Sequence, residues 1–245
     1  MNEVVFVGTS DAFGAGGRRQ SSVLVRGERG TFLFDCGATT NTGLGELGIE
    51  REEIDSILIS HFHGDHFGGI PLFLLAALYE DRRRRPLEIA GPPDIEARVR
   101  TLARAMGHSI EDQDWTFPIS FTELAPGPQH EIGPVRVVSF ETHHQLEAHP
   151  HGYRASAGDA TIVYSGDTGW FDELPRLAAG ADLFICECTF RTHELDFHLN
   201  LEQLVERRAE FDTDHMILTH LGSEMADSRA DSPIQTADDG LKLKL

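Results

Sequence analysis

Short apolar runs, broken by Gly, Asp and Asn, recur along the N-terminal third of the chain. The runs are rich in Val, Ile and Phe, a pattern typical of β-strands that end in turns. It predicts strands over Glu3–Gly8, Ser22–Arg26, Thr31–Asp35, Ile54–Ser60 and Leu87–Ala90.

Two segments between and after these strands have helical patterns instead. The apolar run Pro71–Glu80 follows two glycines and predicts a helix with proline in its first turn. After the turn at Gly91-Pro92-Pro93, we expect Asp94 to cap a charged amphipathic helix that ends near Gly107.

The second half of the chain repeats this alternation of strands and helices. Helices are predicted near Asp172–Ala178 and Leu201–Phe211, and Leu241–Leu245 alternates Leu and Lys as a closing edge strand would. The other predicted strands are Val135–Thr142, Gly152–Ser156, Thr161–Ser165, Asp182–Cys188 and Met216–His220. Strands in both halves end in polar, metal-competent residues, so we expect two sheets packed face to face, helices outside, and a site at one edge.

Length and composition are compatible with one α/β domain over residues 1–245 that folds without disulfides. No stretch approaches the roughly 20 apolar residues of a membrane helix, and no basic leader precedes the first strand. We therefore expect a cytoplasmic protein without a membrane partner. Cys36, Cys186 and Cys188 are predicted to be reduced and buried.

The formal net charge of −19 disfavours broad nucleic-acid binding, which depends on cationic contacts to phosphate. Two metal dications with a local basic patch could still hold one phosphate. We therefore expect a small-molecule or nucleotide-like substrate, and the sequence leaves a homodimer open.

A cluster of histidines follows the predicted strand Ile54–Ser60. His61, His63, Asp65 and His66 lie within six residues, in a loop that is free to bring them to one point. Turns seldom use three imidazoles where Gly, Asn or Ser would serve. Imidazole and carboxylate ligands favour zinc, with manganese or iron as alternatives.

The pattern His61-x-His63-x-Asp65-His66 resembles the signature of the metallo-β-lactamase superfamily. Later motifs follow in the same order, because Ser165-Gly166-Asp167-Thr168 ends one apolar strand and Ile217-Leu218-Thr219-His220 ends another. The resemblance extends from the Gly-rich opening at Gly8–Gly17 to His220. It implies a four-layer αββα sandwich of two mixed β-sheets with helices outside.

The resemblance also implies a ligand set for two Zn²⁺ ions, with Mn²⁺ or Fe²⁺ possible. Such ions would share a hydroxide as nucleophile. Asp65 would be both a ligand and a catalytic residue. The full set is His61, His63 and His144 for one metal, Asp65, His66 and His220 for the other, and Asp167 as the bridge.

The third histidine has two candidates, His143 and His144, which point to opposite faces if they lie on a strand. His144 is favoured because its distance from Tyr153-Arg154 is similar to that in related sequences. We expect His149 and His151 to line a loop. Ordinary surface or core roles are expected for His108, His130, His193 and His215.

Other polar residues near the predicted strand ends have two interpretations. Asp35 either forms a turn or accepts a hydrogen bond from a ligating imidazole. Glu187 is predicted to be a strand residue satisfied by backbone or water. The run Arg82–Arg85 is interpreted as solvated rather than as a phosphate clamp, and the Gly-rich Phe13–Gly17 is only a weak candidate for an anion cradle.

The fold alone does not determine which reaction is catalysed. Differences between this sequence and other enzyme classes of the fold reduce the number of candidate reactions. Antibiotic-degrading enzymes place Cys or His where Asp167 stands, and the flavin-linked di-iron branch has Glu in place of His63. A bridging Asp with a full second site is shared by phosphodiesterases such as ribonuclease Z, thioester hydrolases and lactonases. The opening Gly8-Thr9-Ser10 and His198 most resemble ribonuclease Z. His198 is predicted to act as general acid or as a hydrogen-bond donor to the developing charge, and the alternative is a polar residue that satisfies helix amides or lies on the surface.

Two departures argue against the tRNA 3′ endonuclease activity of ribonuclease Z. Only 22 residues separate His144 from Asp167, which leaves no room there for a long tRNA-binding arm. Leu199-Asn200 follows His198 where that enzyme has Ser-Thr. The sequence thus predicts a small phosphodiesterase or related ester hydrolase. The alternatives are a lactone or thioester hydrolase, the tRNA endonuclease, and a non-catalytic sensor, which the complete ligand set disfavours.

Overall fold

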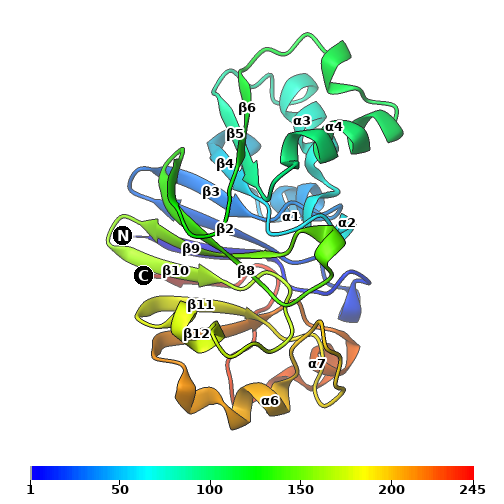
Figure 1. Cartoon of the computed structure of the whole chain (residues 1–245). Helices are drawn as coiled ribbons and strands as arrows, with labels where there is room; N and C mark the ends of the chain where they lie inside the picture. The colour runs from blue at the N-terminus through cyan, green and yellow to red at the C-terminus, as the bar shows by residue number, and fades with distance from the viewer. Residues whose placement is uncertain (1) are drawn as a thin grey trace.

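Two mixed β-sheets pack face to face in the computed structural model, which describes residues 2–245 (Figure 1). The first sheet has the strand order β13-β1-β2-β3-β4-β5-β6. Its strands are β1 (Glu3–Gly8), β2 (Ser22–Gly27), β3 (Gly30–Phe34), β4 (Ile54–Leu58), β5 (Leu87–Gly91), β6 (Ile119–Glu123) and β13 (Lys242–Lys244). Neighbours from β3 to β6 are parallel, and the other pairs are antiparallel.

The second sheet has the order β12-β11-β10-β9-β8-β7. Strands β10, β11 and β12 are parallel, whereas β7 to β10 form an antiparallel meander. Its strands are β7 (Gln129–Ile132), β8 (Val135–Glu141), β9 (His151–Ala157), β10 (Ala160–Tyr164), β11 (Ala181–Glu187) and β12 (Thr213–Thr219).

Side-chain alternation along the strands builds the core between the sheets. In β1, Val4 and Phe6 pack into the space between the sheets, against residues such as Tyr164 of β10. Val5 and Val7 point the other way, into a second apolar cluster beneath the helices. Both faces of the strand are therefore buried, which explains why the sequence has a continuous apolar run there.

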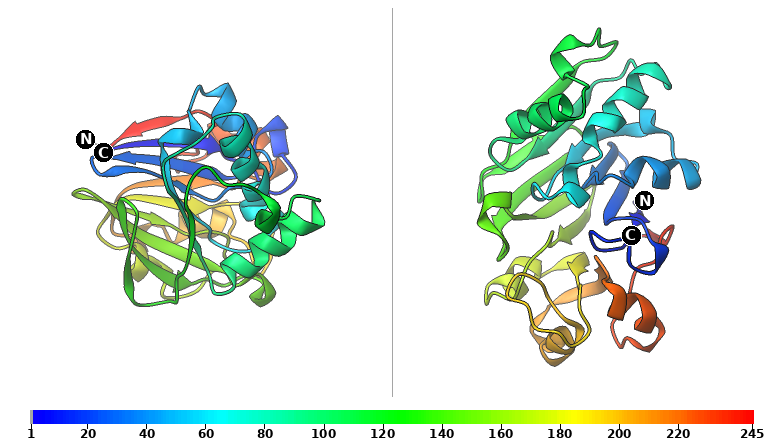
Figure 2. Two further views of the ribbon diagram at one scale, coloured as in Figure 1. Left: turned by 90° about the horizontal axis from the view of Figure 1, so that it is seen from above. Right: turned by 90° about the vertical axis from the view of Figure 1, so that its right-hand side faces the viewer.

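Helices cover the outer faces of both sheets (Figures 1 and 2). Leu44, Phe73 and Val99 bring α1, α3 and α4 onto the first sheet, and Leu204 and Met225 bring α6 and α7 onto the second. The predicted four-layer sandwich is confirmed. The helices are α1 (Thr40–Glu46), α2 (Gly64–Phe67), α3 (Ile70–Tyr79), α4 (Ile95–Ala105), α5 (Leu174–Ala178), α6 (Leu201–Glu206) and α7 (Ser223–Ser228). Within residues 2–245, no helix combines the length and apolar character needed to cross a membrane.

Most predicted elements are present, with ends shifted by a few residues. The edge strands β6 and β7 and the short helices α1, α2 and α7 are absent from the prediction. Three residues of β6 are only partly buried and two are exposed, so its sequence lacks a clear apolar alternation. The helix predicted over Leu201–Phe211 ends at Glu206 and is followed by a separate 3₁₀ turn at Arg208–Glu210.

Two predictions about charged residues are wrong. Asp94 precedes α4 but does not cap it, because its φ of 75° lies outside the extended conformation of a capping residue. Arg83 is not solvated. Its buried guanidinium donates hydrogen bonds to the backbone carbonyls of Arg51, Ile54, Arg85 and Pro86. It therefore ties the end of α3 to the start of β4. The three cysteines are free and buried, as expected.

Candidate metal centre

The predicted ligands converge at one rim of the sandwich, where strands of both sheets end. His61, His63, Asp65 and His66 follow β4, and the one-turn helix α2 lets the last two face the same point. The other three predicted ligands follow separate strands of the second sheet: His144 after β8, Asp167 after β10 and His220 after β12.

His144 rather than His143 joins this cluster, but the premise that the two histidines lie on a strand is wrong. Strand β8 ends at Glu141, so both histidines lie in the following turn and not on a strand. His144 is buried, and its Nε2 lies 3.2 Å from His63 Nδ1. His143 is exposed, and its Nδ1 lies 3.4 Å from the carbonyl of Trp170.

The first donor set consists of His61, His63, His144 and Asp167. Their ligand atoms lie within 4.8 Å of one another. His61 Nε2 is 3.1 Å from His63 Nδ1 and 3.7 Å from Asp167 Oδ2. Three imidazoles and one carboxylate oxygen therefore surround a common point.

The second donor set consists of Asp65, His66, His220 and the same Asp167. His66 Nε2 is 3.1 Å from Asp65 Oδ2 and 3.4 Å from Asp167 Oδ1. His220 Nε2 is 3.4 Å from Asp65 Oδ2 and 3.3 Å from Asp167 Oδ2. All four residues are buried, and Asp167 is the member that the two sets share.

These residues fit two zinc ions. A tetrahedral zinc site with bonds of about 2.0–2.1 Å has edges of roughly 3.3 Å between its ligand atoms, close to the distances in the second set. His66 Nε2 and Asp167 Oδ1 are also buried without a hydrogen-bond partner. Buried polar atoms are rarely left unpaired, so a cation between them accounts for both.

Asp35 supports the second set from behind. Its Oδ2 accepts hydrogen bonds from His66 Nδ1 at 2.8 Å, the Tyr164 hydroxyl at 2.7 Å and the Ser60 hydroxyl at 2.8 Å. Its Oδ1 accepts from the Ser60 amide at 2.7 Å. Asp35 therefore fixes the His66 tautomer that presents Nε2 to a metal, and it also forms a turn, with φ of 58°.

The other histidines have polar supports as well. His144 Nδ1 donates to the carbonyl of Phe197 at 2.9 Å. His220 Nδ1 lies 2.9 Å from Thr189 Oγ1. His220 also has a φ of 56°, a left-handed conformation that is uncommon outside glycine, and its Nε2 lies near the Asp65 carboxylate.

The proximity of acids and imidazoles shifts their pKa values strongly. Burial opposes the charge of His66, but Asp167, Asp65 and Asp35 outweigh it and raise its pKa well above the usual range. Burial likewise opposes the charge of Asp167, but His220 and His66 hold its pKa well below its usual range. Burial, with the neighbouring His66, lowers the pKa of His61. At neutral pH, Asp167 and the imidazole of His61 are therefore in the protonation states that ligate metals.

His198 lies beside both donor sets, and its Nδ1 donates to Glu187 Oε1 at 2.8 Å. Burial lowers the pKa of His198, but the charge and hydrogen bond of Glu187 raise it to about 9. Glu187 also accepts from the amides of Thr168 and Thr189. The backbone contacts of Glu187 match the prediction. The prediction did not include the hydrogen bond between Glu187 and His198. A carboxylate at the end of the otherwise apolar strand β11 is the signal that could have revealed this role.

One histidine prediction needs correction. His151 does not line a loop: it is buried at the start of β9, and burial lowers its pKa to about 4. His193, expected to have an ordinary role, lies in the wall of the cavity over the centre. This cavity has a volume of about 530 Å³ and is bounded by His63, Asp65, Asp167, His198 and His220 among others.

Comparisons with known proteins identify a matching family and relatives of similar sequence. The family described as "Anti-Pycsar protein Apyc1" matches residues 2–238. A ribonuclease Z of Mycobacterium tuberculosis is 30% identical over 192 residues, which cover 76% of this chain and 68% of that protein. A ribonuclease Z of Methanothermobacter thermautotrophicus is 28% identical over 274 residues, 91% of this chain and 87% of that protein.

Solved structures share the fold over the whole chain. The metallo-β-lactamase fold protein YhfI of Bacillus subtilis has a TM-score of 0.79 and 21% identity, with complete coverage of both chains. Human tRNase Z, short form, has a TM-score of 0.78 and 23% identity, and the match covers 99% of this chain and 98% of that one.

The chain therefore belongs to the Anti-Pycsar protein Apyc1 family, within the ribonuclease Z-like branch of the metallo-β-lactamase superfamily. It is a metal-dependent hydrolase, as the sequence predicted.

Proposed function

We propose that the protein is a phosphodiesterase that cleaves a small phosphodiester at a centre of two zinc ions. The observation that carries this proposal is the position of Asp167, which belongs to both donor sets. His61, His63 and His144 would hold one ion, and Asp65, His66 and His220 the other. When bound, such a pair supplies an activated water and stabilises the developing charge on phosphoryl oxygens.

The protein's own contribution to bond cleavage centres on His198. Because Nδ1 is engaged by Glu187, Nε2 is the nitrogen that can reach a substrate in the cavity. Burial opposes the charge of His198, but the charge and hydrogen bond of Glu187 raise its pKa and so favour the protonated ring. His198 would donate this proton to the departing ester oxygen, which leaves poorly as an alkoxide. Glu187 would hold the ring in place and stabilise its charge.

Substrate size is constrained by the walls of the cavity. The 22 residues between His144 and Asp167 form one short turn and the hairpin β9–β10, so this stretch has no protruding arm. The net charge of −19 also disfavours a long polyanion. The ribonuclease Z relatives support phosphodiester chemistry, and precursor tRNA cleavage remains the alternative that a direct assay addresses.

The test uses zinc-loaded protein with bis(p-nitrophenyl) phosphate, a homoserine lactone, a glutathione thioester, a cephalosporin and precursor tRNA. We expect hydrolysis of the phosphodiester, poor cleavage of tRNA at physiological salt and none of the cephalosporin. Elemental analysis should approach two metal equivalents per chain. Faster turnover of the lactone or thioester, or full activity with one metal, would contradict the proposal.

A further inference from the structure

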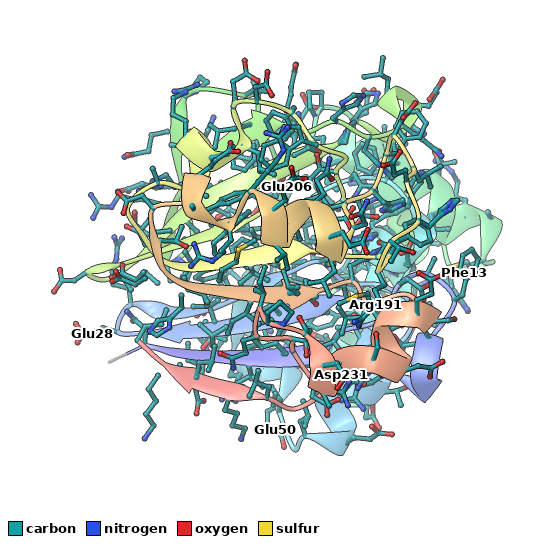
Figure 3. All side chains as sticks on the ribbon, turned by 90° about the horizontal axis from the view of Figure 1, so that it is seen from below. Phe13, Glu28, Glu50, Arg191, Glu206 and Asp231 are labelled. Carbon is teal, nitrogen blue, oxygen red and sulfur yellow. The ribbon has the colours of Figure 1, made fainter. Side chains whose placement is uncertain are left out.

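Phe13 is an aromatic side chain held in solvent at the edge of the cavity. Its side chain is 93% exposed, yet it bounds the same cavity as His63, Asp167 and His198. Figure 3 shows its ring projecting from the edge of the molecule. A single exposed phenylalanine is ordinary, so the argument depends on how its loop is built and on what lies beside it.

The backbone that carries Phe13 is anchored rather than loose. Asp11 Oδ1 accepts hydrogen bonds from the amides of Phe13 at 3.1 Å and Ala15 at 3.2 Å. The amide of Asp11 donates to the carbonyl of Leu221, the residue after His220. At the far end of the loop, Arg18 forms an ion pair with Asp238 at 2.9 Å. These contacts hold the backbone at Phe13 in place relative to the strand end that carries His220.

Two further apolar side chains bound the cavity, from a different part of the chain. Phe190 and Leu195 lie on the segment between β11 and α6, and Leu195 is 44% exposed. This segment leads directly to His198. Apolar side chains from two loops thus contribute walls to one cavity, beside residues that would hold metal and donate a proton.

The charge of the cavity wall excludes an ion pair between a basic side chain and a second anionic group of the substrate. Among the described residues that bound it, none is Lys or Arg, whereas Asp11 and Glu224 add negative charge beside the ligand carboxylates. One phosphodiester could be neutralised by metal ions. Any further part of the substrate would meet carboxylates, which repel a second anionic group, and apolar side chains, which favour a planar aromatic group over a strongly hydrated one.

We propose that Phe13 is a specificity-determining residue, whose ring stacks on a planar uncharged group attached to the scissile phosphodiester. This inference rests on the proposed phosphodiesterase activity. Stacking between a base and an aromatic side chain tolerates different bases because every base has a π-face. Phe13 would therefore select for the presence of an aromatic group more than for its identity.

The experiment compares thymidine 5′-(p-nitrophenyl phosphate) with ethyl p-nitrophenyl phosphate. Both release p-nitrophenolate, so the pair differs only in the group that stays on phosphorus. For Phe13→Ala, we expect the ratio of kcat/KM for the thymidine ester over the ethyl ester to fall roughly 10- to 100-fold, mainly through KM. Binding of thymidine 5′-monophosphate, measured by calorimetry, should weaken by a similar factor.

Two controls separate stacking from general effects. Phe13→Trp should retain the ratio, because it keeps an aromatic face. Leu146→Ala removes another apolar side chain, 80% exposed and outside the cavity wall, and should leave the ratio unchanged.

Other results of the ester comparison would overturn either the role of Phe13 or the phosphodiesterase assignment. An unchanged ratio in Phe13→Ala, with both esters cleaved by the wild type, would overturn the role of Phe13 alone. An equal loss on both esters, with a smaller mass in sedimentation, would make Phe13 a contact between copies of the chain and overturn the proposal. If the wild type cleaves neither ester, the phosphodiesterase assignment itself fails, and the inference falls with it.

Discussion

The two donor sets of the metal centre differ in how firmly the protein holds them. Every residue of the second set is buried, and His66 is hydrogen-bonded to the carboxylate of Asp35. In the first set His63 is only partly buried, and His144 is supported by the neutral carbonyl of Phe197, which lies on a surface segment. Charge-assisted hydrogen bonds are stronger than neutral ones. The second site should therefore be the better organised of the two before metal arrives.

The largest effect is expected where the two sets meet, at Asp167. Asp167→Ala removes one ligand from each set, so we expect both metals to be lost and hydrolysis to fall by several orders of magnitude. Elemental analysis and rates at saturating zinc measure this. Retention of one full metal equivalent with substantial activity would mean that the sets do not depend on a common ligand.

Replacing His198 should affect the rate but not the metal content, in contrast to Asp167, because His198 lies outside both proposed ligand sets. His198→Ala should keep both metals and lose on the order of 10² to 10⁴ in rate on alkyl leaving groups. The loss should be much smaller with p-nitrophenolate, which departs without a proton. An equal loss on both substrates, or a loss of metal, would give His198 a structural or ligating role instead.

Asp35→Asn tests the difference between the sets directly. The substitution keeps the size of the side chain but weakens the acceptor for His66 Nδ1, so we expect zinc affinity of the second site to fall roughly 10- to 100-fold. The first site should be much less affected. Titration with a competing chelator resolves the two affinities, and an equal decrease at both sites would contradict the comparison.

The smallest effect is expected for Tyr164→Phe. The hydroxyl provides one of several hydrogen bonds to Asp35, and Ser60 and His66 supply the others. Losing it should cost about 1 kcal/mol in the free energy of unfolding, measured with urea, and leave the metal content unchanged. A loss of the second metal would show that Asp35 depends on this single donor.

The sandwich and the cluster from His61 to His66 could be predicted because both depend on local patterns, whereas His144, Asp167 and His220 were expected only from the resemblance to the superfamily. Apolar runs locate the central strands, and His61 to His66 lie within one short loop. The edge strand β6 has no such pattern, because two of its residues are exposed and three only partly buried.

Interactions across the fold are what the sequence does not reveal. The pairing of Glu187 with His198 joins strand β11 to the loop that precedes α6. The burial of Arg83 depends on four carbonyls whose position only the folded chain defines. Such contacts have no fixed spacing along the chain, and they are therefore invisible in the pattern of residues.

The hydrogen bond between Asp35 and Tyr164 has a consequence for the whole fold. Asp35 follows β3 of the first sheet, and Tyr164 ends β10 of the second, so the carboxylate behind His66 also joins the two sheets. Occupancy of the second site and cohesion of the sandwich are then thermodynamically linked. An ion that binds only the folded chain adds about 2.7 kcal/mol of stability at 100 times its Kd. The melting temperature of this protein should therefore follow the concentration of free zinc around it.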